Sequence, residues 1–344
     1  MIGIINLVYG IQLDTSQWKE DNITNQFLQQ NFKQISEFSR YYDSLQLSQT
    51  SYANLVRSSE NSGFILIQVL DEYGNQQCNT TIQVKDYLKY SLTSTNVEGE
   101  FFFTYTNQNN SNYKIFFGFL NENCQYSRGL SEPVQPDIFE SKSFQNLLSK
   151  QGKGNIYLVI QGFSQPYYLY LMIVDISVKN TYSIQKHVKL GETGFRWNLF
   201  SIQAFSDDYA VIFARNIDDK LQKIIIKANG NEVWGDPSEQ GIFLSLKQNL
   251  NYIQNKAIQI ENTNKYSIVT GDREQDQFTI YTFQYNGNGQ LKDICLERYQ
   301  NWFGNVGSFF FRYLEFGVIN TEFLWIKGDN YNNNKKTTKV ITTV

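Results

Sequence analysis

The sequence has one histidine, His187, with only three cysteines and four prolines in 344 residues. A single histidine excludes sites in which several imidazoles hold a catalytic zinc, and a Ser-His or Cys-His pair would have to use His187. The cysteines, Cys78, Cys124 and Cys295, show no Cys-x-x-Cys spacing, which argues against zinc binding and dithiol redox chemistry. We therefore predict no catalytic residues, no metal site and no cofactor.

Charge of either sign is also scarce, because charged residues make up 18% of the chain and leave a net charge of −3. The longest basic run is the pair Lys335–Lys336, so the electrostatic footprint of a nucleic-acid binder is missing. No stretch approaches the roughly 18 apolar residues that a membrane-spanning helix needs. We predict neither a nucleic-acid partner nor a membrane span.

Aromatic and uncharged polar residues are abundant instead. The chain has 26 Phe and 23 Tyr, and Asn and Gln together number 67. Aromatic side chains suit the half-buried surface of a pleated sheet, so this composition favours strands. The Asn and Gln content indicates either an adhesive surface or the codon bias of an AT-rich genome, and the overall texture resembles that of ciliate proteins.

A local pattern recurs along the chain: an apolar strand, a polar loop, a second apolar strand and a turn. Its clearest copy has strands at Tyr209–Ala214 and Leu221–Lys227, followed by the turn Asn229–Asn231. Asn-Gly tolerates the positive φ angles of a tight hairpin. Six copies follow one another at spacings of 49 to 57 residues, each preceded by a further apolar segment. Four strands per unit at this period are typical of β-propeller blades.

We therefore predict an all-β fold, a single six-bladed β-propeller domain spanning residues 1–344. The last copy lacks a fourth strand, and we predict that the apolar segment Ile2–Tyr9 supplies it and closes the ring; alternatively, this segment is a leader remnant or a separate strand. The spacing of Phe27, Phe32 and Ile35 predicts a short linking helix over 24–38. The predicted blades are 39–86, 87–138, 139–190, 195–245, 252–300 and 306–344 with 2–9.

Two kinds of residue bear on the cellular compartment. Cys78 and Cys124 fall at matching turns of the first two units, so they are candidates for a disulfide, which is geometrically possible between neighbouring blades; the alternative is three reduced, buried cysteines. Asn-x-Ser/Thr glycosylation sequons occur at Asn22, Asn79 and Asn109. Together they predict an extracellular or cell-surface protein, with a cytoplasmic or ciliary location as the alternative.

Acidic residues in the strand connections are candidates for glycoside hydrolysis or calcium binding, although charged residues in loops are more often simply solvated. Tryptophans near strand ends are candidates for stacking on sugars, although packing between blades explains them as well. The acidic candidates are Asp207, Asp208, Asp218, Asp219, Asp272, Glu274, Asp276 and Asp329. The tryptophans are Trp197, Trp234, Trp302 and Trp325.

The segment Ala228–Trp234 reads Ala-Asn-Gly-Asn-Glu-Val-Trp. It resembles blades of repeat propellers whose outer turn reads Asp-x-x-Gly-Asn-x-x-Trp, with partial matches at Asp71–Asn75 and Tyr285–Asn288. This resemblance implies a scaffold fold found in large secreted or surface proteins, with no catalytic residues to carry over. We predict a non-catalytic scaffold that binds protein partners or self-assembles. The alternatives are a lectin-like carbohydrate-binding propeller, a propeller glycoside hydrolase and an intracellular or ciliary docking propeller.

Overall fold

The structure is a computed structural model of the chain. It describes residues 40–48, 50–57, 63–71, 73–85, 89–109, 112–136, 144–162, 168–192, 200–215, 221–228, 252–253, 258–259, 263–272, 277–300, 311–320, 323–332 and 335–343. Several strand ends, and all residues from 311 onwards, are described at the level of the backbone. The predicted helix over 24–38 and the strand Ile2–Tyr9 lie outside the described residues.

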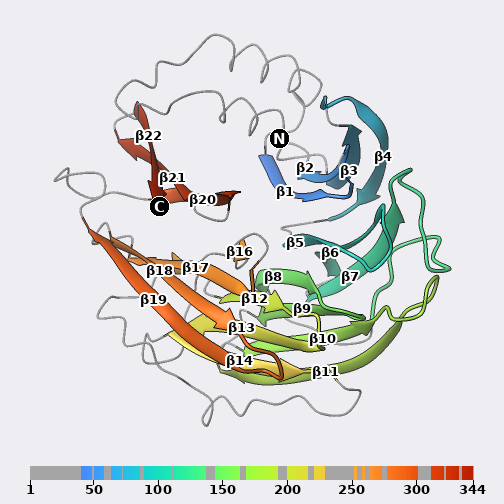
Figure 1. The fold of residues 1–344 in the computed structure, drawn as a ribbon. Helices are drawn as coiled ribbons and strands as arrows, with labels where there is room; N and C mark the ends of the chain where they lie inside the picture. Colours follow the sequence, from blue (N-terminus) through green and yellow to red (C-terminus); the bar gives the residue numbers. More distant parts are fainter. Residues whose placement is uncertain are drawn as a thin grey trace. The chain divides into compact units, whose positions relative to one another are not determined.

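Throughout the described residues, the strands form antiparallel meanders in which consecutive strands lie side by side (Figure 1). The first sheet is β1 (Arg40–Gln46), β2 (Ser51–Arg57), β3 (Phe64–Asp71) and β4 (Gln76–Gln83). The second is β5 (Tyr90–Ser94), β6 (Glu100–Asn109) and β7 (Asn112–Asn121). The third is β8 (Phe144–Gln151), β9 (Asn155–Gly162), β10 (Tyr168–Asp175) and β11 (Ser183–Glu192).

Three further sheets follow in the same way. The fourth is β12 (Phe200–Ala204), β13 (Tyr209–Arg215) and β14 (Leu221–Lys227). The fifth is β15 (Tyr252–Ile253), β16 (Ile258–Gln259), β17 (Lys265–Asp272), β18 (Gln277–Tyr285) and β19 (Leu291–Gln300), with both short strands paired to β17. The sixth is β20 (Phe311–Asn320), β21 (Phe323–Asn332) and β22 (Lys335–Thr343). Each sheet falls within one predicted repeat, except that β11 ends at Glu192, past the predicted end of its blade at residue 190. The number of blades and the closure of a ring stay predictions.

The burial of a strand follows its place in its sheet. Strand β9, between β8 and β10, is buried along its whole length and reads Asn-Ile-Tyr-Leu-Val-Ile-Gln-Gly. Strand β4, the last of the first sheet, is mostly exposed and alternates along Cys78–Gln83. A strand covered on both faces needs a continuous apolar run, whereas a strand with one wet face alternates.

The chain divides into two compact units, Met1–Ile156 with Val174–Ile184 and Tyr157–Ile173 with Gln185–Val344. The first unit contains the first two sheets, and the second contains the last three. Within the first unit, β5 lies beside both β1 and β8. Ser149 of β8 donates its backbone N–H to Ser91 of β5 over 3.1 Å, and both serines are fully buried.

In the first unit, one apolar cluster joins the first sheet to the second. The packing of one sheet face against the next is what neighbouring propeller blades require. Its fully or nearly fully buried members are Ala53, Leu55, Ile65, Ile67, Val69, Ile82, Val84, Leu92, Phe101, Phe103, Tyr105 and Leu120.

In the second unit, a cluster of the same kind joins the fourth sheet to the fifth. Aromatic rings dominate it: Phe205 stacks on Tyr285 with ring centroids 3.6 Å apart, and Phe213 meets Phe283 at 5.1 Å. Its buried members are Phe205, Val211, Phe213, Tyr266, Ile268, Tyr281, Phe283 and Tyr285. The abundance of Phe and Tyr in the sequence is therefore used to fill the space between sheets.

Candidate functional site

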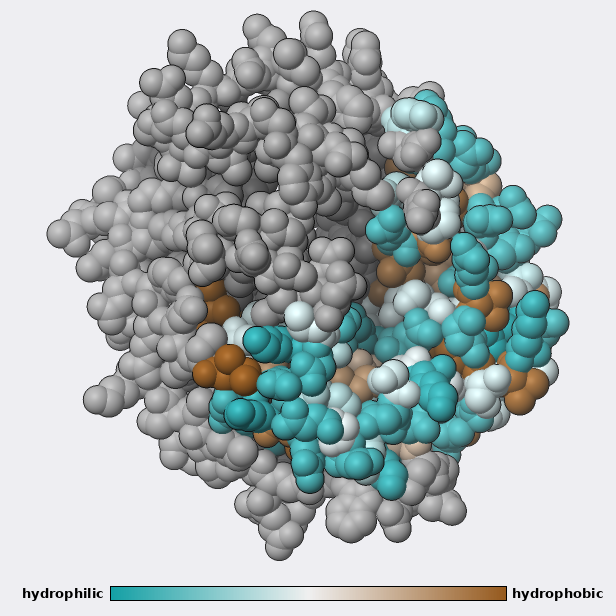
Figure 2. Space-filling view, in the orientation of Figure 1, coloured by the Kyte–Doolittle hydropathy of each residue, from teal (hydrophilic) through white to brown (hydrophobic). Residues whose placement is uncertain are grey.

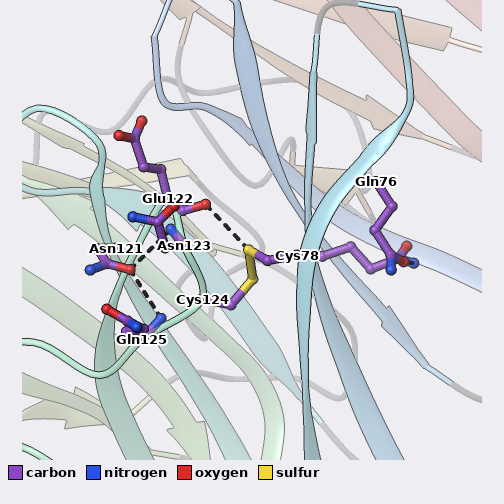
Figure 3. The surroundings of a disulfide bond; sticks show 8 residues. Gln76, Cys78, Asn121, Glu122, Asn123, Cys124 and Gln125 are labelled. Atoms are coloured by element: carbon purple, nitrogen blue, oxygen red, sulfur yellow. Dashed lines mark hydrogen bonds between the residues drawn. A yellow bond between two sulfur atoms is a disulfide. The ribbon is translucent and has the colours of Figure 1, made fainter.

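A disulfide joins the first sheet to the second. Cys78 lies near the start of β4 and Cys124 lies in the turn that follows β7, with Cα atoms 5.9 Å apart and an S–S distance of 2.12 Å (Figure 3). Both side chains are half-buried against the apolar cluster of the first unit. Cys124 has φ of 57°, a left-handed conformation that is uncommon outside Gly, Asn and Asp. The structure thus brings together the two cysteines that the repeat pattern paired.

The carbonyl oxygen of Glu122 lies 3.2 Å from the sulfur of Cys78 (Figure 3). A sulfur in a disulfide carries no proton, so in the oxidised protein this approach is a contact and not a hydrogen bond. In the reduced protein the thiol of Cys78 would donate weakly to this carbonyl.

Two matching turns hold the disulfide in place. Asp71 ends β3 and accepts hydrogen bonds from the backbone N–H groups of Tyr73 and Asn75, at 2.9 and 2.8 Å. Asn121 ends β7 and accepts from the N–H groups two and four residues on, both at 3.0 Å. Asp and Asn side chains favour turns because they can satisfy such orphan donors.

The carboxylate of Asp71 differs from the amide of Asn121 in being able to titrate. Slight burial raises the pKa of Asp71, but hydrogen bonds from the side chain and backbone of Asn75, the backbone of Tyr73 and the side chain of Gln77 outweigh this and lower it. The turn is therefore tied to the ionised form of the carboxyl group.

Asn79 follows Cys78 directly and points to the opposite face of β4. It is exposed, as is Thr81, which completes the Asn-Thr-Thr sequon. Of the other two sequons, Asn22 lies outside the described residues, and Asn109 ends β6, where only the backbone is described. Cys295 lies in β19, also described by its backbone alone.

A buried ion pair joins the second sheet to the turn between β10 and β11. Arg128 Nε donates to Glu100 Oε2 at 2.9 Å, and the two side chains are 0% and 7% exposed. Arg128 Nη1 donates to the backbone oxygens of Val178 and Thr181 at 3.1 and 2.6 Å. Ser127 donates to the second oxygen of Glu100 at 2.6 Å. The pair is thus fully bonded, as a buried charge requires.

Two polar groups, one buried and one half-buried, join the fourth and fifth sheets. Lys223 of β14 is 2% exposed and donates from Nζ to the hydroxyl of Tyr281 at 2.9 Å and to Asp293 at 2.8 Å. Asp207, in the turn before β13, accepts from the hydroxyl of Tyr285 at 2.7 Å and from the backbone N–H of Asn288 at 2.9 Å. Both groups link one sheet to the next, as Arg128 does.

Burial is the main cause of raised tyrosine pKa values around Asp207. It raises the pKa of Tyr285, as does the hydrogen bond to Asp207. It also raises the pKa of Tyr157, to which the charges of Asp208 and Asp207 add. The hydroxyl of Tyr157 is buried and has no hydrogen-bond partner among the described residues. These tyrosines therefore stay neutral in the folded protein.

The structure places the other sequence candidates as follows. Asp207 is one of the acidic candidates, and its oxygens are held by Tyr285 and a turn. His187 is exposed in β11. Seven candidates lie outside the described residues: Asp218, Asp219, Glu274, Asp276, Trp197, Trp234 and Trp302. Three more are described by their backbone alone: Asp272, Asp329 and Trp325.

Sequence reasoning missed Arg128, Glu100, Lys223 and Asp293. Lys223 and Asp293 come from different repeats, and Glu100 and Arg128 lie 28 residues apart within one repeat, so no local pattern identifies either pair. A faint signal exists at Lys223, which stands in the strand Leu-Gln-Lys-Ile-Ile-Ile-Lys beside three isoleucines.

Among the described residues, no three His, Cys, Asp or Glu side chains form a group able to hold a metal ion. No described helix is long and apolar enough to cross a membrane.

No protein-family model and no curated protein sequence matches the chain. Among solved structures, the BP39L lectin from Burkholderia pseudomallei is similar, with a TM-score of 0.54 and 9% identity over 88% of this chain and 80% of the lectin. The periplasmic gluconolactonase PpgL of Pseudomonas aeruginosa gives a TM-score of 0.52 and 9% identity over 85% of this chain and 82% of the enzyme. At such low identity the likeness concerns the fold alone, and that fold is an all-β fold of antiparallel sheets with β-propeller neighbours.

Proposed function

We propose that this protein is a non-catalytic scaffold of an extracellular or cell-surface assembly. The observation that carries the proposal is the disulfide between Cys78 and Cys124, which ties two consecutive sheets together. Disulfides form and persist in secreted and surface proteins and are rare in the reducing cytosol. An exposed sequon at Asn79 directly follows one of the two cysteines, which supports the same compartment.

The use of the buried charges supports a structural role. Lys223 is paired with Asp293 across two sheets. Arg128, paired with Glu100 in its own repeat, also binds the turn between β10 and β11, so both ion pairs hold neighbouring repeats together. Asp207 accepts hydrogen bonds from Tyr285 and Asn288, which tie the fourth sheet to the fifth. The described surface is mostly hydrophilic on the face in Figure 2, with hydrophobic residues in scattered patches.

The test is purification of the full tagged chain from its own cells, separately from the culture medium, the cell surface and the cytosol. The proposal expects the protein in the medium or surface fraction, in particles heavier than one chain. A monodisperse monomer without any co-purifying protein contradicts the scaffold role. Recovery from the cytosol alone favours the intracellular docking alternative.

A lectin-like function is the second candidate, and the observation in its favour is the fold likeness to a protein named as a lectin. The test is a glycan array probed with the secreted full chain. Saturable binding to one glycan class, competed by that free glycan, favours the lectin. An array without any such binding removes this candidate and leaves the scaffold proposal standing.

A further inference from the structure

Strand β4 is the outermost strand of the first sheet and, among the described residues, pairs only with β3. It reads Gln-Gln-Cys-Asn-Thr-Thr-Ile-Gln, with no charged residue and no proline. A register shift beside Cys78 interrupts only its start, and Cys78–Gln83 pairs regularly. An uncharged, regular edge offers its unpaired N–H and C=O groups to any other strand.

The last strands of other described sheets are protected in ways that β4 is not. Strands β11, β19 and β22 each contain at least three charged residues in the sequence. The outer side of β7 is covered, because Phe117 bridges to Val134 and Leu120 to Tyr126. Charged residues and covering loops are two of the devices by which sheet proteins avoid edge-to-edge pairing. The last strand of the fourth sheet, β14, carries two lysines, Lys223 and Lys227. Among the last strands of the sheets, β4 alone has neither a charged residue nor a covering segment within the described residues.

The sequon lies in the middle of this edge. Asn79 is exposed, and its side chain makes no hydrogen bond with the described residues. Thr81 and Gln83 share its exposed face, whereas Ile82 is buried and Cys78 is half-buried and in the disulfide on the other face. A bulky group at Asn79 would therefore stand beside the unpaired edge without disturbing the core.

We propose that an N-linked glycan on Asn79 guards β4 against antiparallel pairing with β4 of a second copy. The proposal rests on the secretory location proposed above. In the modification, the amide nitrogen of Asn79 attacks the anomeric carbon of an oligosaccharide carried on a polyprenyl diphosphate. The new C–N bond replaces the C–O bond to the diphosphate, which leaves, and the amide proton passes to a base of the transferring enzyme.

Three substitutions at one exposed position separate the glycan from the strand. Thr81→Ser keeps the sequon, whereas Thr81→Ala and Thr81→Lys both remove it. Only Thr81→Lys adds a charge to the edge strand, and such a charge opposes strand pairing. The full chains are secreted from the same eukaryotic cells, checked by circular dichroism for equal folding, and compared by light scattering over a range of concentrations.

The wild type and Thr81→Ser are expected to share one mass per particle at all concentrations, with Asn79 glycosylated. For Thr81→Ala, the mass per particle is expected to rise with concentration to about twice the wild-type value, because a two-fold symmetric pair contains two copies. For Thr81→Lys, the mass per particle is expected to equal that of the wild type at all concentrations, because the added charge opposes strand pairing. The proposal that the glycan prevents pairing of β4 is refuted if the wild type is glycosylated at Asn79 and Thr81→Ala stays monomeric. It is also refuted if Thr81→Lys associates as strongly as Thr81→Ala. In both cases the secretory location stands. If Asn79 is bare in the secreted wild type, the guard is refuted as well.

Discussion

At the residue scale, the polar groups buried between sheets act as pairs. Arg128 meets Glu100 and two backbone carbonyls, and its guanidinium also lies 5.0 Å from the ring centre of Phe119. The fork of five donors in arginine suits this bridging role better than a lysine ammonium. Because Glu100 is buried, the loss of Arg128 leaves a buried carboxylate without its cation, and the carbonyls of Val178 and Thr181 lose the same donor.

Arg128→Ala is expected to lower the free energy of unfolding by about 3–5 kcal/mol, since it leaves the carboxylate of Glu100 buried and unpaired. Urea denaturation followed by tryptophan fluorescence measures the change. The control is Lys153→Ala, which removes an exposed cation of the same unit and is expected to change stability by less than about 0.5 kcal/mol. Equal losses of stability for the two substitutions would refute the stabilising role of the Arg128–Glu100 ion pair.

Tyr157 and Tyr285 form a matched pair with opposite expectations. Tyr157→Phe removes a buried hydroxyl without a described partner, so stability should be unchanged or raised. Tyr285→Phe removes the donor to Asp207 and should cost about 1–3 kcal/mol. Thermal unfolding at pH 7 compares the two. A larger loss for Tyr157→Phe than for Tyr285→Phe would contradict the bonding described here.

Asp71 should make the first turn sensitive to acid. Its pKa is lowered on folding, so its contribution to stability is present above the unfolded value of about 4 and fades as pH falls below it. Asp71→Asn should keep the turn, as Asn121 does in the second repeat, and lose this pH dependence, whereas Asp71→Ala should cost roughly 1 kcal/mol at pH 7. Urea midpoints at pH 7 and pH 3 test both; an unchanged midpoint for Asp71→Ala at pH 7 would contradict the turn's role.

At the element scale, the strands and turns could be predicted because their causes are local. Apolar runs and Asn/Asp turns mark the six described sheets, and the alternation of β4 is legible in its sequence. The matching positions of Cys78 and Cys124 in consecutive units make them disulfide candidates, and the structure joins them. The ion pairs could not be predicted in this way. Lys223 and Asp293 become neighbours only when two sheets stack, and Glu100 and Arg128 meet only when the segment after β7 folds back onto β6.

The disulfide should act mainly through the unfolded chain, because it closes a loop with a sequence separation of 46 residues. Loop-closure entropy for this length predicts that the double variant Cys78→Ser/Cys124→Ser loses about 4 kcal/mol, or 2–5 kcal/mol by experience with native disulfides. Scanning calorimetry measures the loss, and a reducing agent should reproduce it in the wild type. If reduction leaves the melting temperature unchanged, the disulfide does not stabilise the fold.

At the scale of the whole molecule, periodicity predicted an all-β repeat fold, and the likeness to β-propeller proteins at 9% identity agrees with that prediction. Function could not be predicted equally well, because a repeat fold of this kind carries partner sites in loops that vary from copy to copy. Knowledge of the cellular compartment would narrow the choice of function most, since the compartment decides whether the Cys78–Cys124 disulfide forms and whether the sequons are glycosylated.

The most direct measurement is therefore a non-reducing peptide map, by mass spectrometry, of the protein taken from its own cells. The proposed function predicts a peptide pair linked through Cys78 and Cys124, together with a glycan mass on the peptide that contains Asn79. Free thiols at both cysteines together with an unmodified Asn79 would contradict an extracellular or cell-surface scaffold.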